Sequence, residues 1–250
     1  MSNSRGRPWT REELILAINL YCQIPFGQIH TGNNEIKKLA EKLGRTPGSI
    51  SYKLANFASI DPSLDREGAK NTSKLDREVW NEFFHNWDEM ILQSVARADA
   101  IELPSQGFGE SPAPEFQYGT DVERTVAVRA NQNIFRRMIL SSYDERCCIT
   151  GIKNTELLVA SHIVPWSKDN QNRLNPMNGL CLNALHDKAF DKGLITLGEK
   201  YEVIVSRKLS HQFFKEYENQ PILLPRRFLP DQEFLEFHRT NVYEKANALN

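Results

Sequence analysis

Two imidazoles, one amide and one carboxylate lie within a short stretch of this sequence, and together they could carry out hydrolysis. His162 ends an apolar run, Asn178 opens the segment N-G-L, and His186 and Asp187 follow it closely. A neutral imidazole can take a proton from water at physiological pH. Hydrolysis of a phosphodiester also needs a clamp for the developing charge, which one hard divalent ion can supply. These residue types therefore suit metal-assisted cleavage of a phosphodiester.

The sequence around these residues forms a longer frame. It reads C-I-T-G at 148–151, A-S-H-I-V-P-W at 160–166, N-G-L-C-L at 178–182 and H-D-K-A-F-D-K-G-L-I at 186–195. In this order the segments resemble the HNH nucleases, whose ββα-metal site holds a divalent ion between a hairpin and a helix. The resemblance covers roughly Thr125 to Tyr243. This part of the sequence is similar to the HNH domains of restriction-type endonucleases.

The resemblance implies a role for each polar residue. His162 would be the general base, held on the end of an apolar strand that turns at Pro165. Asn178 would brace the loop that carries the base by bonding backbone groups on both sides of it. It would also cap a following helix, expected from Cys181 to Phe190. The catalytic set implied in this way is His162, Asn178 and His186.

The same resemblance implies a divalent ion, Mg²⁺ or Mn²⁺, bound by this helix. His186 is the last His of the motif by order, and Asp187 is an equally acceptable ligand. Because adjacent helical residues point about 100° apart, one of the two would bind the ion and the other would support it. Ser161 stands where many HNH nucleases carry an Asp or His ligand, so the ion is expected to be held there more loosely, through water. Asp191 would support the site or bond the backbone turn after the helix.

The cysteines bear on a second metal. Many HNH proteins hold a structural zinc with two C-x-x-C pairs, and this sequence contains no such pair. Cys147 and Cys148 are adjacent, and nothing near Cys181 completes a ligand set. We therefore predict buried free thiols and no structural zinc.

The N-terminal part of the chain predicts three helices. Caps and apolar spacing place them at about Thr10–Cys22, Glu35–Leu43 and Ser49–Phe57. Gly44 is placed to end the second helix in the left-handed conformation, and Thr46 is placed to cap the third. The opening W-T-R-E-E and the run L-A-E-K-L-G-R-T-P-G-S-I-S-Y-K-L are similar to Myb/SANT-type helix-turn-helix domains.

In such a domain the third helix would face the major groove or the phosphates of double-stranded DNA. Arg136, on a later helix, is a further candidate for a phosphate contact. The alternative for this helical region is a protein-interaction module, because SANT-like domains also bind proteins. The residues expected to point outward from the third helix are Ser49, Ser51, Tyr52, Lys53 and Asn56.

The domain organisation follows from two longer segments. Apolar spacing predicts one long amphipathic helix from Leu75 to about Ala100. The Pro- and Gly-rich stretch Gln106 to Gly119 predicts a linker. We therefore expect an α+β protein with a helical helix-turn-helix domain at 1–103, a linker at 104–122 and an HNH nuclease domain at 123–250.

Further elements should frame the nuclease site. The alternation T-V-A-V-R predicts a short strand from Thr125, and apolar spacing predicts a helix from Gln132 to Ser142. After the site, a hairpin is expected from Leu194 to Val205 with its turn at Gly198-Glu199. A helix is expected around His211 to Glu216.

Composition bounds the compartment and the partners. The sequence is 40% apolar and 25% charged, which is ordinary for a soluble globular protein. Its net charge of −1 gives no global argument for nucleic acid, so local basic faces would have to bind DNA. No apolar run is long enough to span a bilayer, and the N-terminus has no apolar signal region. We expect a cytoplasmic protein without membrane contact.

Taken together, these patterns predict metal-dependent cleavage of double-stranded DNA in a restriction or defence setting. By the resemblance, the products would carry 5′-phosphate and 3′-hydroxyl ends. Cutting both strands would favour a homodimer. Two alternatives stay open: a DNA-binding or regulatory protein with an inactive HNH domain, and a nicking or structure-specific nuclease.

Overall fold

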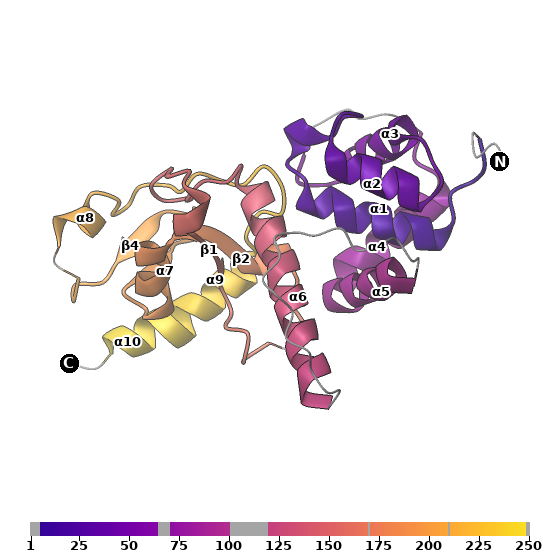
Figure 1. The fold of residues 1–250 in the computed structure, drawn as a ribbon. Helices are drawn as coiled ribbons and strands as arrows, with labels where there is room; N and C mark the ends of the chain where they lie inside the picture. The colour runs from indigo at the N-terminus through magenta and orange to yellow at the C-terminus, as the bar shows by residue number, and fades with distance from the viewer. Residues whose placement is uncertain (1–5, 65–70, 101–119, 170, 210, 249–250) are drawn as a thin grey trace.

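The protein consists of two lobes, with one long helix between them (Figure 1). The computed structural model describes residues 6–64, 71–100, 120–169, 171–209 and 211–248. Helices alone form the N-terminal lobe, and helices with two small antiparallel sheets form the C-terminal lobe. This mixture confirms the α+β class. Of the predicted linker at 104–122, residues 104–119 lie outside the described residues, and residues 120–122 belong to the start of a helix.

The helical lobe begins where capping residues in the sequence indicate. Thr10 and Glu13 form a reciprocal capping box at the first helix, and Thr46 caps the third with its hydroxyl. Gly44 has a φ of +59°, the left-handed conformation that ends the second helix. The three predicted helices are confirmed. The helices of this lobe are α1 (Arg11–Gln23), α2 (Asn34–Lys42), α3 (Pro47–Ala58), α4 (Lys74–His85) and α5 (Trp87–Ala100).

The prediction of a single helix from Leu75 to Ala100 is wrong. The chain breaks at Asn86, whose φ of −144° and ψ of 57° lie outside the helical region. The break turns α5 back on α4, so both helices pack against α1. Trp80, Phe83 and Trp87 are all buried as a result. The apolar residues keep helical spacing through this region and so do not reveal the break. The break is stabilised by packing against α1, which is distant in sequence.

The predicted strand at Thr125 is also wrong. Its residues belong to α6 (Thr120–Ser142), which contains the helix predicted from Gln132. A short alternating run of β-branched residues is a weak signal, and no partner strand is present to pair with it among the described residues. Helix α6 packs against α1 on one side and against the first hairpin on the other.

The first hairpin and the helix after it form the centre of the C-terminal lobe. Strands β1 (Leu158–His162) and β2 (Gly179–Asn183) pair antiparallel with His162 opposite Gly179, and α7 (Ala184–Asp191) follows directly. A Cβ atom on Gly179 would lie 2.3 Å from the Ile139 side chain of α6. The absence of a side chain therefore lets α6 approach the strand ends. The helix predicted from Cys181 begins later, because Cys181 to Asn183 pair within β2.

The remaining elements cover this centre. The second hairpin confirms the prediction made from the alternating pattern, and the short helix after it confirms the helix expected around His211 to Glu216. The four cysteines are buried and unpaired, which confirms the prediction of free thiols. No helix in the described part of the chain is long and apolar enough to cross a membrane. The elements are β3 (Ile195–Leu197), β4 (Val203–Val205), α8 (Gln212–Lys215), α9 (Gln232–His238), a π-helical turn (Arg239–Glu244) and α10 (Lys245–Asn247).

A buried arginine joins the two lobes. The Arg227 guanidinium donates to the carbonyl oxygens of Tyr21 and Ile24 at 2.6 Å each, and to the hydroxyl of Ser141 at 2.9 Å. It also lies 4.7 Å from the centre of the Tyr21 ring. Its side chain thus binds the end of α1 to the end of α6. Hydrogen bonds that carry a full charge in a dry interface are stronger than neutral ones.

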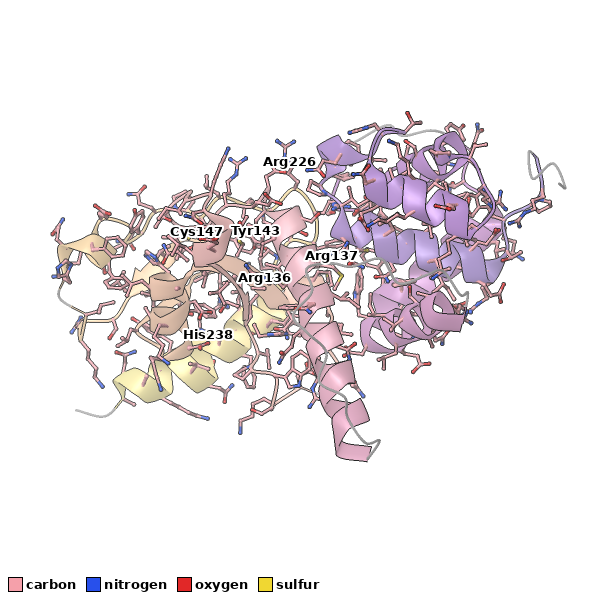
Figure 2. The ribbon with its side chains drawn as sticks, viewed as in Figure 1. Arg136, Arg137, Tyr143, Cys147, Arg226 and His238 are labelled. Carbon is pink, nitrogen blue, oxygen red and sulfur yellow. The ribbon has the colours of Figure 1, made fainter. Side chains whose placement is uncertain are left out.

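Arg227→Ala should lower the free energy of unfolding by about 3–5 kcal/mol, because it leaves buried carbonyl groups unpaired. Urea unfolding measures this change. The adjacent Arg226 is exposed and pairs only with Asp144 in the described part of the chain (Figure 2). Arg226→Ala should therefore cost less than about 1 kcal/mol. Equal losses in the two variants would contradict a specific role for Arg227.

A second buried contact ties α9 to α7 and β3. The ring of His238 stacks on Phe190 with 3.7 Å between ring centres (Figure 2 shows His238 on α9). Its Nε2 donates to the Phe190 carbonyl at 3.1 Å, and its Nδ1 lies 2.8 Å from the Thr196 hydroxyl. Burial lowers the pKa of His238 from 6.5 to about 4. This imidazole is therefore neutral in the folded protein.

Stability should fall as the pH is lowered from about 6.5 to about 4. In that window the unfolded chain binds a proton on His238 and the folded chain does not. The loss amounts to at most about 3 kcal/mol for this group. His238→Gln should be less stable than the parent at pH 7 and should show a shallower decline with acid in urea titrations. His85→Gln, at an exposed histidine, should match the parent in stability at pH 7.

Candidate active site

His162 lies at the end of β1 on the face of the hairpin that α6 covers. Its imidazole stacks on Phe135 of α6, with 3.8 Å between ring centres and 11° between ring planes. Trp166 meets its edge at 5.4 Å. These contacts fix the plane of the ring. The side chain is nevertheless only half-buried, so one edge reaches solvent.

One hydrogen bond decides which nitrogen of His162 carries the proton. Its Nε2 lies 2.9 Å from the carbonyl oxygen of Arg173. A carbonyl oxygen can only accept, so Nε2 must hold the hydrogen and Nδ1 is left with its lone pair. No hydrogen bond to Nδ1 occurs within the described residues. Burial lowers the pKa of His162 below 6.5, partly offset by this hydrogen bond. A neutral imidazole with a free Nδ1 can accept a proton at that atom.

Asn178 braces the loop that follows His162. Its side-chain oxygen accepts from the Val164 N–H at 2.8 Å, and its amide donates to the carbonyl oxygens of Val164 and Asn172 at 3.3 and 3.1 Å. Its own carbonyl accepts from Ile163 N–H at 3.0 Å. The amide thus holds both ends of the loop. Asn178 does not cap the helix after it, because that position belongs to Asn183.

Ser161 and Asp187 lie together on the opposite face of the hairpin, against α7. Successive residues of a strand point to opposite faces, so Ser161 turns away from the side that holds His162. Its hydroxyl is buried and lies beside the Asp187 carboxyl. Burial raises the pKa of the Asp187 carboxyl, the nearby Ser161 hydroxyl lowers it, and the charge of Asp191 raises it again.

His186 occupies a different environment from Asp187. It is 1% exposed, and its Nδ1 lies 3.0 Å from the side-chain amide of Asn183. Its ring is enclosed by aromatic rings, and its Nε2 has no hydrogen-bond partner among the described residues. Burial lowers its pKa to about 4. The enclosing rings are those of Phe213, Phe214 and Tyr217, each within 5.5 Å between ring centres.

The donors near Asp187 bear on whether a divalent ion fits. Within the described residues no group of three or more His, Cys, Asp or Glu side chains is close enough to enclose a metal. Mg²⁺, however, keeps several waters and is commonly held by one or two carboxylates together with substrate phosphate. Asp187, the buried hydroxyl of Ser161 and the neighbouring Asp191 supply oxygen donors of that kind. These residues fit an open magnesium or manganese site.

Two residues expected to face DNA are buried, which corrects the prediction. Lys53 pairs with the fully buried Asp76 at 2.8 Å, and Asn56 is 2% exposed. Both lie on the face of α3 that packs inward, because Asp76 of α4 supplies a partner that local spacing does not reveal. Ser49 and Ser51 are half-buried, and Tyr52 is exposed.

Arg136 has a structural role that the sequence did not indicate. Its guanidinium donates to the carbonyl oxygens of Leu158 at 2.7 Å and Thr155 at 2.8 Å, where β1 begins. Figure 2 shows it on α6 beside Arg137, between the lobes. These donors are engaged with the hairpin. Nor does the sequence indicate that the Arg173 carbonyl contacts His162, because every residue type carries the same backbone carbonyl.

Comparison with known proteins bears on this same region. Residues 147–198 match the family of HNH endonucleases. The match begins at Cys147, contains both strands of the first hairpin and all of α7, and leaves the helical lobe outside. It supports an HNH nuclease, and the resemblance of the helical lobe to Myb/SANT domains stays a prediction. A search of curated proteins finds no match to the chain.

Asn178→Asp should destabilise the site loop. A carboxylate still accepts from Val164 N–H but cannot donate to the two carbonyl oxygens that now receive the amide. Urea unfolding should show a loss of roughly 3 kcal/mol, since the new charge is buried beside acceptors. Asn154→Asp, at an exposed asparagine that caps a turn, should change stability by less than about 0.5 kcal/mol. A harmless Asn178→Asp would show that the loop needs no amide.

Proposed function

We propose that this protein is a metal-dependent endonuclease that hydrolyses phosphodiester bonds in double-stranded DNA. The observation that carries the proposal is the hydrogen bond from His162 to the Arg173 carbonyl. It places the hydrogen of the neutral imidazole on Nε2, so that Nδ1 is the only ring nitrogen able to take a proton. The match of residues 147–198 to HNH endonucleases supports the same chemistry.

In this proposal His162 removes a proton from the attacking water through Nδ1. The depressed pKa keeps the imidazole neutral at physiological pH, so it is competent in nearly every molecule. Stacking on Phe135 and bracing of the loop by Asn178 hold the ring in one orientation. Such positioning lowers the entropic cost of bringing base and water together.

Asp187 is the proposed metal ligand, with Ser161 beside it and Asp191 in support. A bound Mg²⁺ or Mn²⁺ would neutralise charge on the phosphate and on the departing oxygen. His186 is not assigned to the ion, because its ring is buried among the rings of Phe213, Phe214 and Tyr217. Its proposed role is to hold α8 against the start of α7, and thereby to set the direction of Asp187.

The helical lobe is proposed to contact DNA through the exposed part of α3. Tyr52, Ser49 and Ser51 are the residues left for such contacts once Lys53 and Asn56 are removed from the set. A restriction or defence role, action as a homodimer and a cytoplasmic setting belong to the same proposal. They rest on the resemblance of the frame to restriction-type HNH domains.

One observation favours a rival function. Ser161 replaces the acidic or imidazole ligand that many HNH nucleases carry before the base, and a hydroxyl is a weak metal ligand. A DNA-binding protein with an inactive nuclease domain would tolerate that replacement. The two functions differ in whether DNA is cut.

Plasmid DNA incubated with the protein and Mg²⁺ or Mn²⁺ should be cleaved, and EDTA should abolish cleavage. His162→Ala and Asp187→Asn should each lower the rate by at least about 100-fold, since each removes a group used in the transition state. His186→Phe should fold and retain much of the activity, whereas a metal ligand would not tolerate it. His85→Ala, at an exposed histidine on α4, is the matched control.

The form of the product distinguishes the alternatives. Linear plasmid from a protein that sediments as a dimer supports double-strand cutting, and accumulation of nicked circles supports a nicking nuclease. Parallel reactions on unmodified and methylated DNA test the restriction role. DNA that is shifted in a gel but never cut, by parent and His162→Ala alike, would establish the inactive DNA-binding protein.

A further inference from the structure

A single peptide group connects the helical lobe to the proposed base. The carbonyl oxygen of Arg173 accepts from His162 Nε2 at 2.9 Å. The N–H of Leu174, which belongs to the same planar peptide unit, donates to the carboxylate of Asp88 at 3.3 Å. Asp88 lies in the first turn of α5, far from His162 in sequence. The three groups thus form one chain of hydrogen bonds that crosses from one lobe to the other.

The hydrogen bonds between Asp88 and His162 polarise one another in a defined direction. A carboxylate that accepts from one side of a peptide draws the peptide hydrogen toward it and increases the negative charge on the carbonyl oxygen. That oxygen then binds the Nε2 hydrogen of His162 more strongly, which increases the basicity of Nδ1. Consecutive hydrogen bonds polarise one another in this way, most effectively where water is excluded.

The surroundings of Asp88 make its charge sensitive to pH near neutrality. Burial raises its pKa to about 6, although the N–H groups of Leu174 and Arg173 and the Arg173 guanidinium lower it and Asp169 raises it. At pH 7.5 the carboxylate is charged, and most of that charge is lost below pH 6. Asp88 therefore titrates in a range where an enzyme can be assayed.

We propose that Asp88 is a positioning residue that orients and polarises His162 through the Arg173–Leu174 peptide. This inference rests on the proposed function of His162 as a base. The helical lobe then does more than contact DNA, because its α5 supplies the outermost member of the chain that prepares the base. The side chain of Asn178 also braces the loop, but its bonds go to Val164 and Asn172, which precede this peptide.

Two variants separate charge from position. Asp88→Asn keeps an oxygen that can accept from Leu174 N–H and removes the charge, whereas Asp88→Ala removes both. Glu89→Gln is the matched control: it removes the same charge from the same helical turn at an exposed residue that bonds only Gln93 within the described chain. Circular dichroism and urea unfolding establish that each variant is folded.

The first readout does not depend on cleavage. In ¹⁵N spectra of histidine-labelled protein, with the His162 signals assigned by their loss in His162→Gln, the parent should show a protonated Nε2 and an unprotonated Nδ1 at pH 7.5. Asp88→Ala should give a mixture of the two neutral tautomers, and Asp88→Asn should lower the pKa of His162. Glu89→Gln should match the parent.

The second readout is the rate of plasmid cleavage against pH. Asp88→Ala should lower the rate roughly tenfold and Asp88→Asn roughly threefold at pH 7.5, with Glu89→Gln unchanged. In the parent the Leu174 amide signal should also shift with a midpoint near pH 6, the pKa of Asp88, which requires no variant. Asp88→Asn should abolish that shift.

The outcomes are distinguishable. Unchanged His162 signals in folded Asp88→Asn and Asp88→Ala, or a Leu174 amide that does not titrate in the parent, would overturn the inference even if the protein cuts DNA. Altered His162 signals in a protein that cuts no DNA would support the link from Asp88 to His162 and reject the nuclease. If Asp88→Ala does not fold, Asp88→Asn and the parental titration decide.

Discussion

The hydrogen bond between His162 and the Arg173 carbonyl is the interaction on which the site depends. It fixes the tautomer, and it leaves Nδ1 as the single basic nitrogen of the ring. A carbonyl in an irregular loop keeps its place only if the loop is held by other groups. Asn178 supplies three such bonds from one side chain, and Asp88 holds the N–H of the same peptide. The reaction proposed for His162 therefore depends on the hydrogen bonds that hold this one loop in place.

Strand geometry divides the site into two faces. Adjacent residues at the end of β1 point to opposite sides, so His162 meets α6 and Ser161 meets α7. Gly179 on the partner strand lets α6 come close enough for Phe135 to stack on the imidazole. A base on one side and oxygen donors on the other would bracket a phosphate placed over the strand ends. The hairpin thus holds the proposed base and the proposed metal ligand on opposite faces of one strand.

The two lobes are joined by contacts that desolvate charge. Arg227 loses contact with water where it binds the carbonyl groups at the end of α1. Asp88 loses part of its contact with water where it binds the backbone of the site loop. Buried polar groups of this kind are costly unless every partner is in place. Such interactions favour one relative arrangement of the lobes over others. They link the helical lobe to the loop that contacts His162.

The sequence by itself determined the starts of the first three helices, the second hairpin and the order of the motif residues. Thr10 and Thr46 cap their helices through bonds a few residues away, so residue type and spacing suffice to predict them. Tertiary structure alone decided which polar residues are buried and what they meet. Lys53 turned inward to a carboxylate of another helix, and His186 became enclosed by rings from a later segment. Burial and partnership are set by residues distant in sequence, and a single sequence carries no local record of that proximity.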